Sequence, residues 1–461
     1  NTTYLPSLEL TFEDQDEIDN VDLHSLNLPE VRTTPFLNTS DDILILSDAL
    51  SLYGGTYAQK QVAIALYGLI REWDMSQKTD MSSLFKNKQT FNEDISNWDV
   101  SNVTTMENMF EFAYLFNNGG ESLNKWNTSK VTNMKNMFKS ARAFDQPINT
   151  NVQNAGGSNE YVAWDVSNVT NMSYMFYDDS DNVPFNQPLN KWDTSAVTNM
   201  SYMFKKANVF NQNLTQNTVT DITDTSYEAW DVSQVTNMQS MFDRCAKFNN
   251  GSIDSNGDSS TEAQNALVWN TASLINMREM FLRCTNFNSE MVSEWSGDSD
   301  NLTITTWDLS NVEDAHAMFE NCTNFEQEIR TWNMKPLFDL HTSRLTENGY
   351  EYNVVIIGDM FKNATAFLDT YPVTVTPAIT FWTLSTSNPN HTPLPQFNTG
   401  VAADDNQTLK DAIDLYVNSK SKSIATDTYG EIKDWDTSTI TDMSSLFKNK
   451  QTFNEDISNW D

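Results

Sequence analysis

The sequence has little cysteine, little positive charge and no long apolar run. Only 3 of its 461 residues are cysteine, an odd number that does not make a disulfide framework. No stretch approaches the roughly 18 consecutive apolar residues of a transmembrane helix. Lys and Arg number 28 against 63 Asp and Glu, so the formal net charge is −35. Because phosphate backbones are bound mainly by cationic side chains, this balance argues against a nucleic-acid binder and against adhesion to anionic membranes.

The sequence is also poor in groups that commonly carry catalysis. Its four histidines lie in unrelated contexts, without a nucleophile–base pairing or a metal-ligand spacing: His24, His316, His341 and His391. We therefore expect no enzyme, no catalytic residue, no cofactor and no cofactor-binding residue. Aromatic residues, in contrast, make up 12% of the chain, which argues against disorder. Since residue 1 is Asn and no signal peptide precedes it, we expect a processed product or a piece of a longer protein.

A tandem repeat marked by tryptophan runs through the chain, and its shortest period is 25 residues, from Trp73 to Trp98. After each marker, Asp, Ser, Val, Met, Met-Phe, a small residue and Phe-Asn follow at fixed offsets. The markers are Trp73, Trp98, Trp126, Trp164, Trp192, Trp230, Trp269, Trp307 and Trp332, with a further one at Trp435. Most extra residues share one slot, between the Asn and the next Trp, as at 150–160, 217–227, 252–266 and 296–305. Insertions that share a slot become loops on one face of a repeat stack, often the binding face.

The spacing within a repeat predicts a strand and a short helix. Residues 188–192 alternate up to the Trp, which favours a strand, whereas Val197, Met200 and Met203 are three residues apart, which favours a helical turn. One strand and one helical turn per roughly 25 residues is typical of leucine-rich repeats. We therefore predict an α/β repeat solenoid, leucine-rich-repeat-like, of about nine rungs with a helical N-terminal cap. The alternative is a parallel β-helix, and in both cases the rung tryptophans should lie in a file.

The chain is expected to have five parts, of which the second is the cap. In the cap, Asp42 begins one helix that ends at Gly54-Gly55, and Thr56 begins another toward Arg71. The predicted parts are an acidic extended segment or tail of a preceding module (1–40), the helical cap (41–72), the repeat solenoid (73–368), a β-rich segment and linker (369–403), and the cap and first rung of a second module (404–461).

A larger duplication supports the last of these parts. Residues 79–99 and 441–461 carry the same 21 letters, TDMSSLFKNKQTFNEDISNWD, and they start 362 residues apart. We therefore expect the chain to hold one module and the start of the next.

The phrase WDVSNVTNMSYMF at Trp164–Phe176 resembles the tandem 25/26-residue repeat of bacterial surface lipoproteins. That family is related to the BspA-like leucine-rich repeats. The resemblance covers roughly 41–368 and 404–461, and its motif is specific for the repeat. It implies a surface protein or an adhesin, and it implies no particular chemistry.

Several residues recur at fixed places in the repeat. Cys245, Cys284 and Cys322 each lie 15 residues after a rung Trp, where other rungs carry Ala. We interpret them as buried, reduced thiols rather than a metal or redox ladder, and the Met stripe as core. The Asp after each Trp is expected to form a turn with its own backbone, and the recurrent Asn beside it a ladder along the stack.

Two inserted loops carry the remaining candidate sites. Asp254, Asn256 and Asp258 are similar to part of a calcium loop, although the rest of that pattern and its Glu are missing. A solvated loop is therefore the first interpretation, and calcium is the weak alternative. Asn301, in an Asn-Leu-Thr sequon, is the candidate for glycosylation.

These observations predict a structural or adhesive protein of the extracellular space, at a cell or virion surface. Its tandem modules should assemble into a fibre or surface appendage. The expected partners are other copies or modules of itself, head to tail, and a surface glycan or protein, with no nucleic acid and no direct membrane insertion. The alternative is a glycan- or protein-binding recognition module that uses the loops inserted between rungs.

Overall fold

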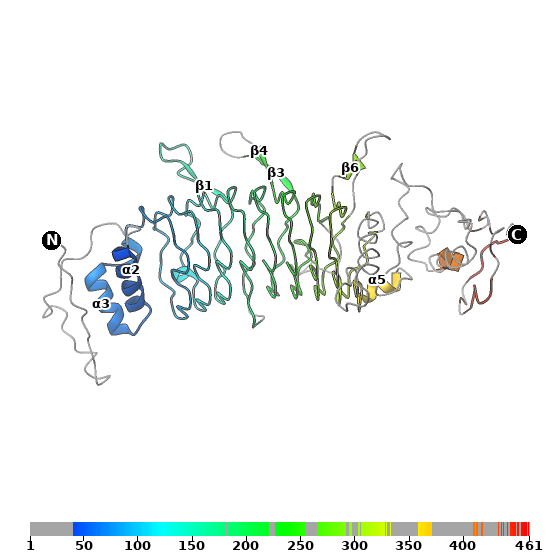
Figure 1. Ribbon diagram of the computed structural model, residues 1–461, viewed down its shortest axis with the longest axis horizontal. Coiled ribbons are helices and arrows are strands. Elements are labelled where there is room, and N and C mark those ends of the chain that lie inside the picture. Colours follow the sequence, from blue (N-terminus) through cyan, green and yellow to red (C-terminus); the bar gives the residue numbers. More distant parts are fainter. Residues whose placement is uncertain are drawn as a thin grey trace, which may run out of the picture.

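The computed structural model describes residues 40–180, 183–220, 226–253, 265–291, 295–296, 303–304, 306–327 and 358–370, and individual positions between 329 and 332 and between 409 and 460. Within these residues the chain forms an elongated stack of rungs with a pair of helices at its N-terminal end (Figure 1). Residues 1–39 of the predicted acidic segment and 371–403 of the predicted linker lie outside the described residues.

Two helices, α2 (Ser40–Tyr53) and α3 (Tyr57–Tyr67), form the cap. As predicted, Thr56 caps α3, because its side chain accepts a hydrogen bond from the N–H of Gln59 while the Gln59 side chain accepts one from the N–H of Thr56. The helix α2 begins two residues before Asp42, so that Asp42 lies inside the helix and the predicted cap position is wrong.

The helix α3 ends earlier than predicted, at Gly68, whose φ of 75° is open to glycine at little cost. A single 3₁₀ turn, η2 (Ile70–Glu72), follows and leads into the first rung. The hydroxyl of Tyr53 ties the cap to this turn, because it donates to the carbonyl of Gly68 at 2.6 Å and accepts from the N–H of Ile70 at 2.8 Å. Its ring also meets Trp73 edge-on, with 5.3 Å between centroids.

Backbone hydrogen bonds join each rung to the next through the segment around Met-Phe. The N–H of Ser83 donates to the carbonyl of Glu107 at 2.8 Å. The same peptide group continues the chain of bonds, because the N–H of Asn108 donates to the carbonyl of Lys135 at 2.9 Å. Every second residue repeats this pattern, so peptide groups are linked head to tail along the stack.

The short helix predicted in each rung is wrong for the described rungs between 73 and 327, where this segment is a run of tight turns. The N–H of Leu84 donates to Met81 and that of Lys86 to Ser83, both three residues back. Ser83 and Asn87 have φ of 58° and 63°, which interrupts a helix. A helix would use all its N–H groups internally, whereas here half of them bind the next rung.

The strand predicted up to the Trp is likewise wrong for residues 188–192, which form no strand, and the parallel bridge between successive rungs lies seven residues after the Trp. The bridged residues occupy one position of the repeat and form a continuous file: Asp80, Thr105, Asn133, Asn171, Asn199, Asn237, Asn276 and Asp314. The repeat therefore stacks as expected, while turns supply most of its backbone geometry.

The core consists of files of identical side chains that run the length of the stack. Rung tryptophans follow one another in a file as expected, and five neighbouring pairs stack, with centroids 6.4 Å apart for Trp73 and Trp98 and 5.9 Å for Trp269 and Trp307. Phenylalanines form a second file, in which Phe85 lies parallel to Phe110 at 5.2 Å. The Met stripe is buried, which confirms that it is core: Met81, Met106, Met109, Met134, Met137, Met172, Met175, Met200, Met203, Met238, Met241, Met277, Met280 and Met318.

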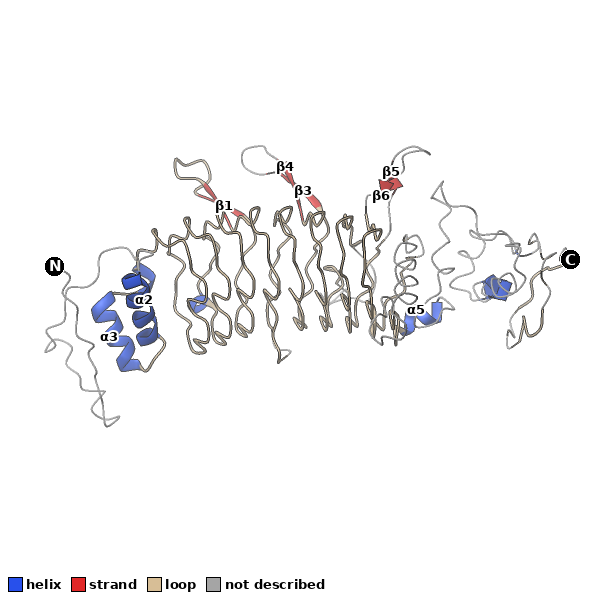
Figure 2. Ribbon diagram, viewed as in Figure 1, coloured by secondary structure: helices blue, strands red, loops and turns tan. Residues whose placement is uncertain are grey.

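Regular strands occur only in insertions, as far as the described residues go. Three antiparallel hairpins project from one edge of the stack (Figure 2). Their strands are β1 (Asn151–Gln153) with β2 (Tyr161–Ala163), β3 (Asn217–Thr220) with β4 (Ser226–Ala229), and β5 (Trp295–Ser296) with β6 (Thr303–Ile304). Two further short elements are the 3₁₀ turn η3 (Asn118–Gly120) and the helix α5 (Thr365–Thr370).

Candidate functional site

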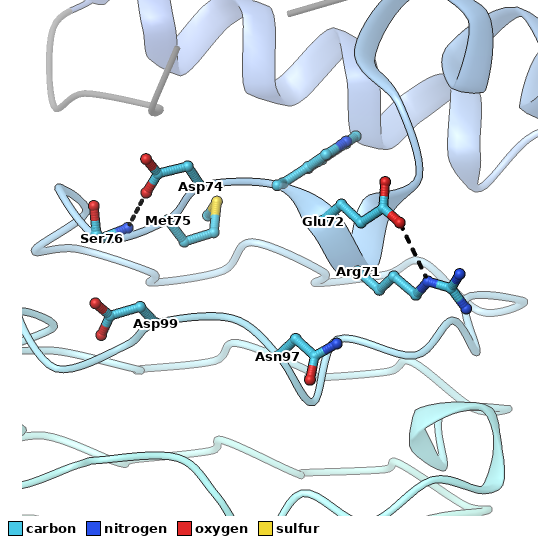
Figure 3. Close-up of a pocket in the computed structure, with 8 residues that line it drawn as sticks. Arg71, Glu72, Asp74, Met75, Ser76, Asn97 and Asp99 are labelled. Atoms are coloured by element: carbon cyan, nitrogen blue, oxygen red, sulfur yellow. Dashed lines mark hydrogen bonds and ion pairs between the residues drawn. The ribbon is translucent and has the colours of Figure 1, made fainter. Parts of the chain in front are cut away.

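A shallow hollow lies where the helical cap meets the first rungs, with a volume of about 630 Å³. The turn η2 supplies Arg71 and Glu72, the first rung supplies residues 73–76, and the second supplies Asn97 and Asp99. Figure 3 shows Arg71 and Glu72 at one side of the hollow and the carboxylates of the two rungs at the other. Its lining is mostly polar and exposed, so it can hold a polar ligand by hydrogen bonds.

The side chains in this hollow interact with their own neighbours in the chain. The Asp74 carboxylate accepts a hydrogen bond from the N–H of Ser76 at 3.0 Å, and Arg71 Nε lies 3.8 Å from Glu72 Oε1. The lining contains no His, Cys or Lys that could act with Ser76 as a nucleophile and base. The hollow therefore offers a binding surface and no evident reacting group.

The row of hairpins is the second candidate site, and two hairpins are fixed to the stack in the same way. The hydroxyl of Tyr161 on β2 donates to the carbonyl of Lys125 at 2.7 Å. The hydroxyl of Tyr227 on β4 donates to the carbonyl of Lys191, also at 2.7 Å. In the third hairpin Ile304 takes the equivalent place, three residues before the rung Trp. Two of the three projections thus have a defined orientation at their base.

Buried carboxylates beside the Met-Phe segment form a third feature, which sequence reasoning missed. Glu111 lies 2.6 Å from Lys86 on the preceding rung and 2.9 Å from Lys139 on the following one. Burial by itself would raise the pKa of Glu111, but hydrogen bonds and charge from the two lysines lower it below its ordinary value. The alternation of Lys, Glu and Lys at one repeat offset was the available signal.

The same arrangement recurs farther along the stack. Arg142 Nε donates to both carboxylate oxygens of Asp178 at 3.2 Å, and Lys205 lies 2.8 Å from Asp243. The pKa of Asp178 is lowered, because hydrogen bonds and the Arg142 charge outweigh the effect of burial. Burial dominates at Asp243 and raises its pKa above the ordinary value, despite Lys205. These pairs link neighbouring rungs on one surface.

The three cysteines are free and buried, as predicted. Each thiol donates to a phenylalanine carbonyl one rung back, at 2.7 Å for Cys245 and 2.8 Å for Cys284 and Cys322. Burial raises the pKa of all three thiols above the ordinary value. They are therefore core residues in a protonated, unreactive state.

The predicted turns are confirmed, and so is the Asn ladder beside them. Asp193 accepts from the N–H of Ser195 at 3.0 Å, as the Asp of a turn should. In the ladder, the side-chain amides of Asn102 and Asn168 donate to the carbonyls of Ser76 and Ser129 on the preceding rung, both at 2.8 Å.

A second amide ladder was not predicted. On the Phe-Asn side, Asn92 accepts from the N–H of Asn117 at 2.8 Å, and Asn117 in turn accepts from that of Asp145 at 3.0 Å. The recurring Phe-Asn dipeptide could have indicated this second ladder.

The remaining predicted sites lie outside the described residues. These are the calcium candidate at Asp254, Asn256 and Asp258 and the glycosylation candidate Asn301, which stay predictions. Across the part of the chain that is described, no group of three or more His, Cys, Asp or Glu side chains is placed to hold a metal ion. None of the described helices is long and apolar enough to span a membrane.

The stacked rungs define a tandem-repeat protein, and a comparison with protein families identifies which one. The family described as "Mycoplasma protein of unknown function, DUF285" matches five consecutive stretches: 57–162, 153–228, 224–301, 297–376 and 396–461. The chain belongs to this family. Comparisons with curated proteins and with solved structures gave no match.

Proposed function

We propose that this chain is a structural or adhesive protein that acts outside the cell, at a cell or virion surface, and assembles into a fibre or surface appendage. The observation that carries the proposal is the uninterrupted ladder between rungs, in which the same backbone bonds and the same Trp and Phe contacts repeat along the stack. Such a stack is a stiff rod whose length is set by the number of repeats. A rod with projections along one edge suits a role as spacer or attachment element.

The proposal includes the type of repeat. The helical cap and the single parallel bridge per rung support a solenoid related to leucine-rich repeats, with turns in place of the usual helix, rather than a parallel β-helix. They also support the kinship with BspA-like surface lipoproteins that the repeat motif suggests.

The proposed partners follow from the same features. Other copies or modules of the chain bind head to tail, and a surface glycan or protein is contacted, without nucleic acid and without direct membrane insertion. No catalysis and no cofactor are required for this role.

Immunogold labelling of intact cells or particles that make the protein tests the proposal. We expect label on the outer surface, and negative-stain images of the purified protein should show rods or filaments. Label confined to the interior, together with compact particles, would contradict it.

A second candidate is a recognition module whose hairpins bind a glycan or protein. The observation that favours it is the pair of matching bonds from Tyr161 and Tyr227, which orient two hairpins with different tips in the same way. Replacing residues 154–160 by Asn-Gly shortens one hairpin without touching Tyr161. Deleting 119–121, a short insertion in the same slot of another rung, is the matched control. Lost attachment with intact rods in the first variant alone would favour recognition, and unchanged attachment would exclude this hairpin.

A further inference from the structure

The outer surface of the stack carries two lanes of opposite charge. The first, the Met-Phe lane, comprises 82–90, 107–115, 135–143, 173–180, 201–209, 239–247, 278–286, 316–324 and 358–366, with twelve Lys and Arg against eight Asp and Glu. The second, the Trp-Asp lane, comprises 74–80, 99–105, 127–133, 165–171, 193–199, 231–237, 270–276 and 308–314, with nine Asp and Glu against two Lys. On a chain with a net charge of −35, a surface with excess cations is unexpected.

In the Met-Phe lane, the most deeply buried charged groups are acids, and their cationic partners lie nearer the surface. The Glu111 side chain is 5% exposed while Lys86 is 38% exposed, and Asp178 is fully buried while its partner Arg142 is 32% exposed. Ammonium and guanidinium groups therefore outnumber carboxylates at the surface of this lane, where Asp179 and the side chain of Asp359 are also exposed to solvent. Buried carboxylates hold the cations in place from below, which lowers the entropy lost when they bind a partner.

In the Trp-Asp lane, the carboxylates reach the surface. Asp99 and Asp193 are at least partly exposed, and each uses one oxygen to accept from the backbone two residues on, at 3.0 Å. Lys78, one of the two cations of this lane, is buried. The lane thus presents negative charge, fixed by its turns.

We propose that the Met-Phe lane of one copy docks along the Trp-Asp lane of a second copy, so that stacks associate side by side. The inference rests on the proposed structural role and adds a lateral contact to it. Single rungs of the two lanes differ in charge, but over the whole length twelve cations against eight acids give the Met-Phe lane +4, and two cations against nine acids give the Trp-Asp lane −7, so two copies side by side attract through these totals. Charge complementarity between these two surfaces of the same molecule is what selects a second copy as the partner.

The net charge sets a distinctive salt dependence. Two bodies of −35 repel each other when screening is weak, at ~0.01 M salt, where the screening length is about 30 Å. At ~0.15 M the length is about 8 Å, so the whole-body repulsion fades while the contacting lanes still attract. At ~1 M the screening length falls to about 3 Å, so the attraction between the lanes is screened as well. Association should therefore peak at intermediate salt, whereas apolar end-to-end contact should strengthen steadily.

Sedimentation velocity of the full chain at these three salt concentrations tests the inference. The lane variant is Lys206→Glu with Lys247→Glu and Arg283→Glu. The control makes the same change of charge outside the Met-Phe lane, with Arg71→Glu, Lys125→Glu and Lys191→Glu. Circular dichroism of both confirms that they fold.

We expect the wild type and the control to associate most at intermediate salt, and the lane variant to associate at least about tenfold more weakly. Equal association of both variants, a monomeric wild type at all three concentrations, or association that rises steadily with salt would each overturn the lateral contact. Surface labelling and end-to-end filaments are measured separately, so they can persist when the lateral contact fails.

Discussion

Residues 79–99 and 441–461 have one sequence in two settings. In the first copy the following rung packs against Phe85 through Phe110, and Met81 is fully buried. In the second, which is the last rung of this sequence, the equivalent Met443 is 40% exposed and Phe447 is only partly buried. Part of the burial of a rung's core side chains is therefore supplied by the rung that follows.

Other contacts are the same in both copies. The indole N–H of Trp98 donates to the carbonyl of Ile70 at 2.7 Å, and that of Trp460 donates to Ile432 at the same distance. These carbonyls belong to the cap side of each copy. The comparison therefore separates the contacts between a rung and its cap from the contacts between a rung and the rung that follows.

The largest difference in unfolding free energy between the two copies should come from replacing a phenylalanine of the file. Phe85→Ala removes a fully buried ring and should cost about 3–5 kcal/mol of unfolding free energy. Phe447→Ala removes a partly buried ring and should cost about 1–2 kcal/mol. Urea unfolding combined with segment-resolved hydrogen exchange measures both. Equal losses would mean that the neighbouring rung adds nothing.

Replacing the tryptophans should lower the unfolding free energy in both copies, with a smaller difference between the copies than the phenylalanines give. Trp98→Phe and Trp460→Phe both delete an indole N–H and leave a carbonyl unpaired, which costs about 1–2 kcal/mol in each copy. The smaller phenylalanine ring adds a further loss of unfolding free energy only at Trp98, which is the buried copy. Hydrogen exchange of each cap turn reports the shared part, and a loss in one copy alone would refute it.

Lys86 forms an ion pair with Glu111 of the following rung, whereas among the described residues the equivalent Lys448 forms none. Lys86→Ala removes the contact with Glu111 and should cost about 0.5–1 kcal/mol after allowance for solvent screening, whereas Lys448→Ala should cost close to nothing. Because the pKa of Glu111 is lowered on folding, its contribution is present above its unfolded value, about 4.3, and is lost as the pH falls through the folded value. Denaturation measured at pH 7 should separate the two variants, and the difference should vanish in acid. A difference that persists there would point to packing of the Lys stem instead.

The smallest difference between the two copies should come from the turn aspartates, whose replacement should lower the unfolding free energy equally in both. Asp94 and Asp456 accept hydrogen bonds from the backbone N–H two residues on, within the same turn, at 2.9 and 3.0 Å. Replacement of either by Ala should cost about 0.5–1 kcal/mol, and replacement by Asn much less. Matched thermal melts of the four variants test this, and unequal losses would show that the turn depends on the neighbour.

The sequence allowed the periodic features to be predicted because each depends on spacing alone. The Trp file, the Met core, the buried cysteines and the cap at Thr56 all follow from offsets that repeat or from a local capping pattern. The Tyr–Trp contact of the cap was not predicted, but it recurs in the second copy, where Tyr416 meets Trp435 edge-on at 5.6 Å as Tyr53 meets Trp73.

The predicted helix failed because spacing does not reveal where a backbone N–H is directed. Val197, Met200 and Met203 are three residues apart both in a helix and in a run of turns that share their bonds with the next rung. The burial of Glu111 was equally hidden, because it depends on two lysines that lie 25 and 28 residues away in the chain. Both features arise between rungs, where sequence periodicity within one rung carries no information.

The head-to-tail peptide groups of the Met-Phe segment make the stack an electrical dipole. Each peptide unit contributes about 3.5 D, and here the N–H groups point away from the cap, from Ser83 to Glu107 and onward to the rung of Ala317 and Gly358. Bonds that run the opposite way, such as Thr104 to Thr79, are fewer than those of the Met-Phe segment and cancel part of the sum. The negative end therefore lies at the cap and the positive end lies toward the last rungs. Two stacks placed end to end attract in one orientation and repel in the other, so a rod assembled from them has a fixed direction.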